Sequence, residues 1–164
     1  MNIISWNIRG ANGLPKQQAL KHIIQDEKPS IILLKETKSS QESLTNTFKT
    51  NWRGANCIEN DFQGNAGGMV IIWDSNKVNI NNMQANRSYI SASFHLIGSS
   101  MEGTICNIYG PQTTPLNLNF LQKFNRLIEH SQKSLIVGGG FNIITTLLEK
   151  KRGNKKTRPG REII

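Results

Sequence analysis

The feature that constrains this chain most is an apolar run at residues 134–137 that leads directly into three consecutive glycines. The run, Ser-Leu-Ile-Val, has the composition of a buried strand. Glycines weaken a regular strand, so Gly138, Gly139 and Gly140 are expected to end it. Glycine also allows the backbone to approach a ligand closely. The sequence therefore predicts a buried strand with Asn142 at its C-terminal end.

Two further strands are predicted near the N-terminus, with a helix between them. Residues 2–8 alternate in polarity, so that one face is apolar and Asn7 lies on the other. Residues 30–34 are almost continuously apolar, which favours a strand buried on both faces. Pro15 suits the first turn of a helix, and Pro29 ends it because the residue before a proline avoids helical geometry. The apolar stripe of this helix consists of Ala19, Leu20, Ile23 and Ile24.

The middle of the chain carries mainly strand patterns, after a short helix expected over residues 42–50. Antiparallel strands are predicted in this region, with a turn at Asn81-Asn82. The predicted strands are 67–74, 78–80, 88–97 and 103–109. A second long helix precedes the glycine run, with an apolar stripe of Leu118, Leu121, Phe124, Leu127 and Ile128. The order strand–helix–strand–helix, several strands, then helix–strand favours an α+β sandwich.

Positive charge is concentrated at the C-terminal end. The 164 residues carry a net charge of +9, and residues 148–164 alone hold seven basic and two acidic side chains. We therefore expect one domain over 1–147 and a basic loop or disordered tail over 148–164. Such a tail either contacts a phosphate backbone or is simply solvated.

The cysteines and the apolar content indicate the class of protein. Cys57 and Cys106 lie on separate apolar segments, so both are predicted to be reduced thiols, with no disulfide. No apolar run approaches the length that spans a bilayer, and the first residues lack a secretory pattern. We expect a nuclear or cytoplasmic protein that is neither secreted nor bound to a membrane.

Polar or aromatic side chains stand at four predicted strand ends. They are Asn7, Glu36, Tyr109 and Asn142. Because sites form where strand ends converge, we expect these four residues in one cleft. A carboxylate at the mouth of a buried strand must be solvated, paired or bound to a metal. Position alone leaves open whether Glu36 is such a ligand or a surface residue that begins a loop.

Five short motifs together resemble the endonuclease/exonuclease/phosphatase superfamily. They are Ser-Trp-Asn-Ile-Arg-Gly (5–10), Leu-Lys-Glu-Thr-Lys (34–38), Gly-Gly-Met-Val-Ile-Ile-Trp (67–73), Asn-Ile-Tyr-Gly-Pro (107–111) and Gly-Gly-Gly-Phe-Asn (138–142). More narrowly, they resemble the apurinic/apyrimidinic-like endonuclease domain of plant LINE-type (non-LTR) retrotransposons. The resemblance implies a four-layer α/β sandwich of two packed sheets between helices, incomplete here at the C-terminus.

The resemblance also implies the chemistry, which is hydrolysis of a DNA phosphodiester with Mg²⁺ or Mn²⁺. By motif, Glu36 corresponds to the metal ligand and Asn7 to the amide beside the metal. Tyr109 corresponds to a tyrosine near the scissile phosphate, and Asn142 to an asparagine that orients the water or the phosphate. Nucleic acid would be contacted by Arg9, Lys38, Lys150, Lys151 and Arg152.

The sequence departs from the family pattern in two places. Gly140 stands where the resemblance calls for an aspartate, and the chain ends before a later Ser-Asp-His-type motif. None of His22, His95 and His130 belongs to a family motif. The sequence thus predicts a truncated endonuclease domain with an impaired site.

Two alternatives remain open on the sequence. The first is a catalytically inactive remnant that still binds nucleic acid. The second is a branch of the superfamily acting on phospholipids or inositol phosphates, to which the charge of +9 is less suited. An incomplete second sheet would also leave an unpaired edge near residues 135–137, through which we expect self-association.

Overall fold

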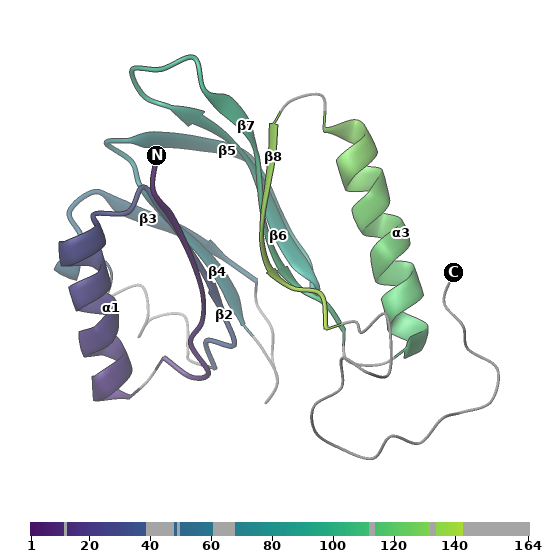
Figure 1. Cartoon of the computed structure of the whole chain (residues 1–164), viewed down its shortest axis with the longest axis horizontal. Helices are drawn as coiled ribbons and strands as arrows, with labels where there is room; N and C mark the ends of the chain where they lie inside the picture. The colour runs from purple at the N-terminus through teal and green to yellow at the C-terminus, as the bar shows by residue number, and fades with distance from the viewer. Residues whose placement is uncertain are drawn as a thin grey trace.

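Two four-stranded sheets pack face to face in the computed structural model, with one helix on the outer side of each (Figure 1). The structure describes residues 1–11, 13–38, 48, 50–60, 68–111, 114–131 and 134–142. Within these residues, helix α1 covers the first sheet and helix α3 covers part of the second. This is the predicted α+β fold, with its layers in the order helix, sheet, sheet and helix.

The first sheet has the strand order β1-β2-β4-β3. Strands β1 (Ile3–Asn7) and β2 (Ile31–Lys35) are parallel and are joined by α1 (Leu14–Glu27), as the N-terminal pattern predicts. Strands β4 (Met69–Asp74) and β3 (Ala55–Glu59) complete the sheet in antiparallel pairing. Every residue of β2 and β4 is buried, because both strands lie inside the sheet and are covered on both faces.

The second sheet has the strand order β5-β6-β7-β8. Strands β5 (Val78–Ala85), β6 (Tyr89–Leu96) and β7 (Glu102–Tyr109) form an antiparallel meander. Helix α3 (Thr114–His130) then returns the chain, so that β8 (Ser134–Gly140) runs parallel to β7. Each sheet therefore contains one parallel pair joined by a helix, which brings strand ends from both sheets to one end of the molecule.

The main core lies between the sheets. Alternation along the strands sends one set of side chains into it from each sheet. The set includes Ile31, Leu33, Ile71, Ile90, Phe94 and Ile105. Since each fully buried side chain of this size contributes roughly 1.5–3 kcal/mol, this layer holds the two sheets in register.

The strand predictions were wrong in the region around Asn82. A turn was expected at Asn81-Asn82, but β5 continues to Ala85, and its register with β6 shifts between Asn81 and Gln84. Asn82 has a left-handed φ of 49°, a conformation that asparagine tolerates better than most residues. The turn-prone residues are thus absorbed by a β-bulge. Strand β3 was missed because its residues alternate weakly between apolar and polar.

The prediction for the glycine run was also wrong in part. Strand β8 does not stop at Val137 but continues through Gly140, and Val137 is 39% exposed. Among the described strands β8 pairs only with β7, so it is an edge strand rather than a buried one. Gly139 has a φ of 151°, and a Cβ there would collide with the carbonyl oxygen of Ile108. The glycines therefore serve close strand pairing instead of ending the strand.

Several other predictions concern the helices and the termini. Ile128 was expected on the apolar stripe of α3 but is 44% exposed. Of the helix expected over 42–50, only Phe48 and Thr50 are described; both are helical, and Phe48 is buried. The tail over 148–164, with Lys150, Lys151 and Arg152, lies outside the described residues.

The cysteine prediction is confirmed. Cys57 and Cys106 are not joined in a disulfide, and burial raises the pKa of Cys106 to about 12. Among the described helices, neither is long and apolar enough to cross a membrane.

Candidate active site

Strands β1 and β2 stay side by side beyond their last residues. The backbone amides of Ile8, Gly10 and Ala11 donate to the carbonyl oxygens of Lys35, Glu36 and Thr37 at 3.0, 2.7 and 2.8 Å. These bonds extend the parallel pairing into the two loops. The carboxyl ends of β1 and β2 are thus held side by side, with Asn7 and Glu36 as neighbours.

The Glu36 carboxylate is held by side chains from both sheets. Its Oε1 accepts a hydrogen bond from Asn7 Nδ2 at 2.7 Å and one from the Tyr109 hydroxyl at 3.1 Å. Three strand ends that lie far apart in the sequence therefore meet on one oxygen. Both donors stabilise the ionised carboxylate. Because both bond to Oε1, Oε2 can face a ligand.

The groups around Glu36 favour the charged form of its carboxylate. The hydrogen bond from Asn7 contributes most to lowering the pKa of Glu36 below its ordinary value. Partial burial opposes that shift, while the Tyr109 hydroxyl reinforces it. The positive charges of Lys38 and Arg9 lower the pKa further. Glu36 is therefore an anion at neutral pH.

The backbone of the site adopts an uncommon conformation at four residues. Arg9, Glu36, Lys38 and Asn142 all have left-handed φ values, between 46° and 55°. Such values cost free energy in residues other than glycine and persist only where the surrounding structure imposes them. Their concentration at these strand ends is typical of functional sites.

Asn142 lies beside Tyr109 at the end of the second sheet. Gly140 pairs with Tyr109 across β7 and β8, and the Gly110 amide donates to the Gly140 carbonyl oxygen at 2.8 Å. Asn142 Nδ2 then donates to the Gly110 carbonyl oxygen at 2.5 Å. Between them, Phe141 anchors the segment, because its ring packs against two phenylalanines of α3.

Gly140 leaves room where the resemblance calls for an aspartate. It lies two residues beyond Gly138 on the face of β8 that looks toward the first sheet, where Gly138 faces Ser5 and Leu33. Among the described residues, a Cβ at Gly140 would meet only Asn142 Oδ1, at 3.8 Å. A Cβ at this position therefore meets only an ordinary van der Waals contact among the described residues, and glycine supplies no carboxylate.

The structure brings together three of the four expected residues, because Asn7 and Tyr109 both bond to Glu36. Asn142 bonds to Gly110, the residue after Tyr109, and a single cleft shared by all four residues stays a prediction. Arg9 and Lys38 border this site with exposed side chains. His22 is exposed on α1, and His95 pairs in register with Glu102 at the opposite end of the second sheet, so neither reaches the site. The side chain of His130 lies outside the described residues.

Sequence reasoning missed the polar residues beneath the site. Lys35 is only 5% exposed, and its Nζ donates to Ser5 Oγ at 2.5 Å. Burial lowers the pKa of Lys35. Asn107 is fully buried, and its Nδ2 donates to the carbonyl oxygens of Leu34 and Val70 at 2.8 and 3.0 Å. A polar residue interrupting an apolar strand pattern was the available signal for both.

Asn107 joins the two sheets directly below the strand ends. It belongs to β7, whereas its two acceptors belong to β2 and β4. Its Oδ1 is buried and has no hydrogen-bond partner among the described residues. The relative position of Glu36 and Tyr109 is thus fixed by a buried polar contact as well as by apolar packing.

The residues present suit a magnesium ion that keeps most of its water. The described residues contain no group of three or more His, Cys, Asp or Glu side chains that would enclose a metal. Magnesium dehydrates reluctantly and is commonly held by one or two carboxylates together with water and phosphate oxygens. The ionised, solvent-accessible carboxylate of Glu36 meets that requirement, whereas a site for zinc would need more protein ligands.

Comparison with known proteins agrees with this geometry. Residues 4–160 match the Endonuclease/Exonuclease/phosphatase family. The chain belongs to this family. Its members include nucleases and phosphatases and generally depend on a divalent metal ion. No curated protein shows significant sequence similarity to the chain.

Solved structures of the family share this fold at low sequence identity. The endonuclease domain of TRAS1, a telomere-specific non-LTR retrotransposon, matches over 93% of this chain with a TM-score of 0.62 and 17% identity. D. rerio TDP2 complexed with a single-strand DNA product matches over 87%, with a TM-score of 0.63 and 15% identity. A mannosyl-6-phosphatase from Bacteroides thetaiotaomicron matches over 86%, with a TM-score of 0.66 and 14% identity. The chain spans 60–65% of the length of these three structures.

Proposed function

We propose that this chain is a phosphodiester hydrolase domain of the DNA endonuclease type, dependent on Mg²⁺ or Mn²⁺ and derived from a plant LINE-type retrotransposon. The observation that carries the proposal is the Glu36 carboxylate, ionised and held by Asn7 and Tyr109 at converging strand ends. The similar structures include the TRAS1 endonuclease domain, which supports a nuclease of retrotransposon type. The net charge of +9 suits a polyanionic substrate.

Each residue of the site has a distinct part in this proposal. Glu36 Oε2 binds the metal, and Asn7 keeps the carboxylate turned toward it. The metal, when bound, stabilises the negative charge that develops on the phosphate. Tyr109, near the scissile phosphate, holds Glu36 through its hydroxyl, and Asn142 has a second amide N–H with which it donates to the water or a phosphate oxygen. Arg9 and Lys38, both exposed at the border, neutralise the charge of the DNA backbone.

The proposed activity is impaired because one catalytic group is absent. Gly140 places no side chain beside Asn142, so no carboxylate at this position activates the attacking water. A positioned acid or base is worth about 10²–10⁴ in rate. The described histidines His22 and His95 are both remote from Glu36, so neither replaces the missing carboxylate. We therefore expect a bound metal without a well-positioned nucleophile.

A nicking assay on supercoiled plasmid with Mg²⁺ tests this proposal. The wild-type chain is compared with Glu36→Ala and Gly140→Asp, and the TRAS1 endonuclease domain serves as an active reference. We expect wild-type nicking at least about 10²-fold below the reference, abolished by chelation of the metal and by Glu36→Ala. Robust wild-type nicking that disappears in Glu36→Ala would contradict the impairment, while nicking unaffected by Glu36→Ala would contradict the site.

The same assay tests whether Gly140 is the sole defect. We expect Gly140→Asp to restore little activity, because residues that act as a unit lose activity non-additively and neither His22 nor His95 lies at the site. Recovery to the level of the reference by this one substitution would show that Gly140 alone limits the site.

A second candidate function is binding of nucleic acid without cleavage. Arg9 and Lys38 border the site, and the C-terminal residues Lys150, Lys151 and Arg152 add further positive charge. Salt-dependent DNA binding with no metal-dependent nicking favours this candidate. Removing residues 149–164 is then expected to flatten the dependence of the binding constant on salt.

A further inference from the structure

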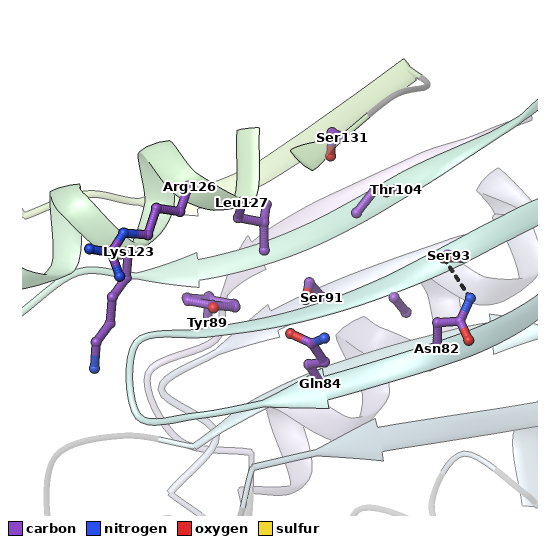
Figure 2. A pocket seen from close by; sticks show the side chains of 11 residues that line it. Asn82, Gln84, Tyr89, Ser91, Ser93, Thr104, Lys123, Arg126, Leu127 and Ser131 are labelled. Atoms are coloured by element: carbon purple, nitrogen blue, oxygen red, sulfur yellow. Dashed lines mark hydrogen bonds between the residues drawn. The ribbon is translucent and has the colours of Figure 1, made fainter. Parts of the chain in front are cut away.

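A groove with a volume of about 480 Å³ lies between α3 and the outer face of the second sheet (Figure 2). We refer to it as the α3 groove. Its floor carries the amides of Asn82 and Gln84 together with hydroxyl groups of β6 and β7, and α3 contributes Lys123 and Arg126. Among the described residues, no carboxylate lines it. Its volume falls within the range of about 300–1,000 Å³ that is typical of ligand sites.

The strand pattern explains why this face is polar. Ile90, Ala92 and Phe94 point into the core between the sheets, so Ser91 and Ser93 point outward from β6. The outward-facing side chains of β7 and β8 include apolar ones, and α3 covers these. The part of the face beyond α3 is therefore polar, with Ser91 buried and Ser93 half-buried.

The β-bulge in β5 adds to this display. Asn82, in its left-handed conformation, turns its side chain toward β6, where Nδ2 donates to Ser93 Oγ at 3.4 Å (Figure 2). Bulges often redirect a side chain next to a functional site. Here the bulge places amides from β5 alongside the hydroxyls of β6.

The cations of the groove share one edge of α3. Lys123 and Arg126 are three residues apart, which puts them on the same side of a helix, and both are exposed. Figure 2 shows them at one end of the groove, next to Tyr89. Two cations, with no carboxylate among the described lining residues, favour an anionic ligand. The half-buried ring of Tyr89 offers a face on which a base stacks.

The aromatic end of the groove adjoins the candidate active site. Tyr89 pairs in register with Ile108, and the amide of Tyr109 donates to the Ser88 carbonyl oxygen at 2.8 Å. Tyr89 and Tyr109 therefore occupy the same end of the second sheet, on opposite faces.

We propose that the α3 groove binds a single-stranded segment of nucleic acid. Lys123 and Arg126 contact its phosphates, a base stacks on Tyr89, and the amides of Asn82 and Gln84 bond to base or sugar edges. The choice of nucleic acid as ligand rests on the proposed function. The groove itself is separate from Glu36, because the second sheet lies between them.

Fluorescence anisotropy with a labelled single-stranded oligonucleotide, in a buffer containing EDTA, tests the proposal. Lys123→Gln/Arg126→Gln removes two phosphate contacts, so the slope of log K against log salt is expected to fall by about 1.4. Tyr89→Leu is expected to weaken binding about tenfold, whereas Tyr89→Phe keeps the ring and the affinity. Lys21→Gln/Arg53→Gln is the control, because it removes the same charge from exposed positions on α1 and in the turn before β3.

Three outcomes overturn the proposal. One is an equal loss of slope in the groove variant and the control, which would indicate a general charge effect. Another is competition by AMP as strong as that by an oligonucleotide of the same phosphate concentration, which would indicate a simple anion site. The third is absence of oligonucleotide binding by the wild-type chain. Thermal melting of each variant verifies the fold, and failure of nicking leaves the result readable because binding needs no metal.

Discussion

Glu36 accepts both of its side-chain hydrogen bonds through one oxygen, so its other oxygen stays available while its orientation is fixed from two sheets. The surrounding residues with left-handed φ values are in conformations that cost free energy, so the packing of the site must hold them there. By contrast, Gly140 offers space without a functional group. The candidate site thus combines a firmly held carboxylate, which we propose as the metal ligand, with a position that lacks the second carboxylate of the family motif.

The lowered pKa of Glu36 leads to a prediction that needs no metal. Because the folded pKa lies below that of the unfolded chain, about 4.3, the associated stability is fully present above that value and is lost as pH falls through the folded pKa. Asn7→Ala removes the largest cause of the shift, so the titration midpoint of Glu36 is expected to rise. NMR titration of the Glu36 side-chain carbon measures this, and an unchanged midpoint in Asn7→Ala would contradict the assigned cause.

Near the site, strands and loops lie so close together that some positions have no room for a Cβ and require glycine. At Gly139 a Cβ would run into the carbonyl oxygen of Ile108, and at Gly110 it would run into that of Phe141. Gly68, which begins the segment leading into β4, is likewise packed against the Thr37 side chain. In these glycine-containing motifs, neighbouring strands and loops of the same sheet therefore approach one another closely.

Gly139→Ala is expected to lower the free energy of unfolding by more than about 2 kcal/mol. Both an unfavourable φ, worth roughly 1–2 kcal/mol, and a backbone collision contribute to this loss. Gly98→Ala is a matched control, because Gly98 also has a positive φ, of 77°, but a Cβ there would meet no described atom within 4 Å. Urea denaturation of both variants gives the comparison, and equal losses would show that φ alone matters.

The elements were largely predictable, and the exceptions have local causes. Continuous apolar runs such as 30–34 and the proline boundaries of α1 determine their structure through burial and backbone geometry alone. The bulge at Asn82 was mistaken for a turn because asparagine serves both structures. The contacts of Glu36 followed from no local pattern, since Asn7 and Tyr109 reach it only through packing of the two sheets. Lys35 and Asn107 each carried a local signal, a polar residue in an apolar pattern, but their partners on other strands followed only from the packing.

At the scale of the whole molecule, the two sheets are held together by an apolar layer and by Asn107, while one edge is left open among the described strands. Strand β8 pairs only with β7 there, and Val137 is 39% exposed along it. An exposed edge with unpaired backbone groups and an apolar side chain promotes association with another chain. Self-association through β8 thus remains a prediction.

Val137→Lys is expected to reduce this association, because a lysine on an edge strand opposes pairing. Sedimentation velocity at increasing protein concentration measures the effect. Leu14→Lys is the control, since Leu14 is 73% exposed on α1 and its replacement introduces the same charge away from the edge. A wild-type chain that stays monomeric at every concentration would contradict the prediction, as would equal behaviour of the two variants.

The central claim is that Glu36 binds a divalent metal at the converging strand ends, and paramagnetic broadening tests it most directly. Substoichiometric Mn²⁺ is added to the ¹⁵N-labelled chain, and amide signals are compared between the wild type and Glu36→Gln. We expect the signals of Asn7, Glu36, Gly110 and Asn142 to broaden first in the wild type and to remain sharp in Glu36→Gln. Broadening centred elsewhere, or the same broadening in both proteins, would contradict the claim.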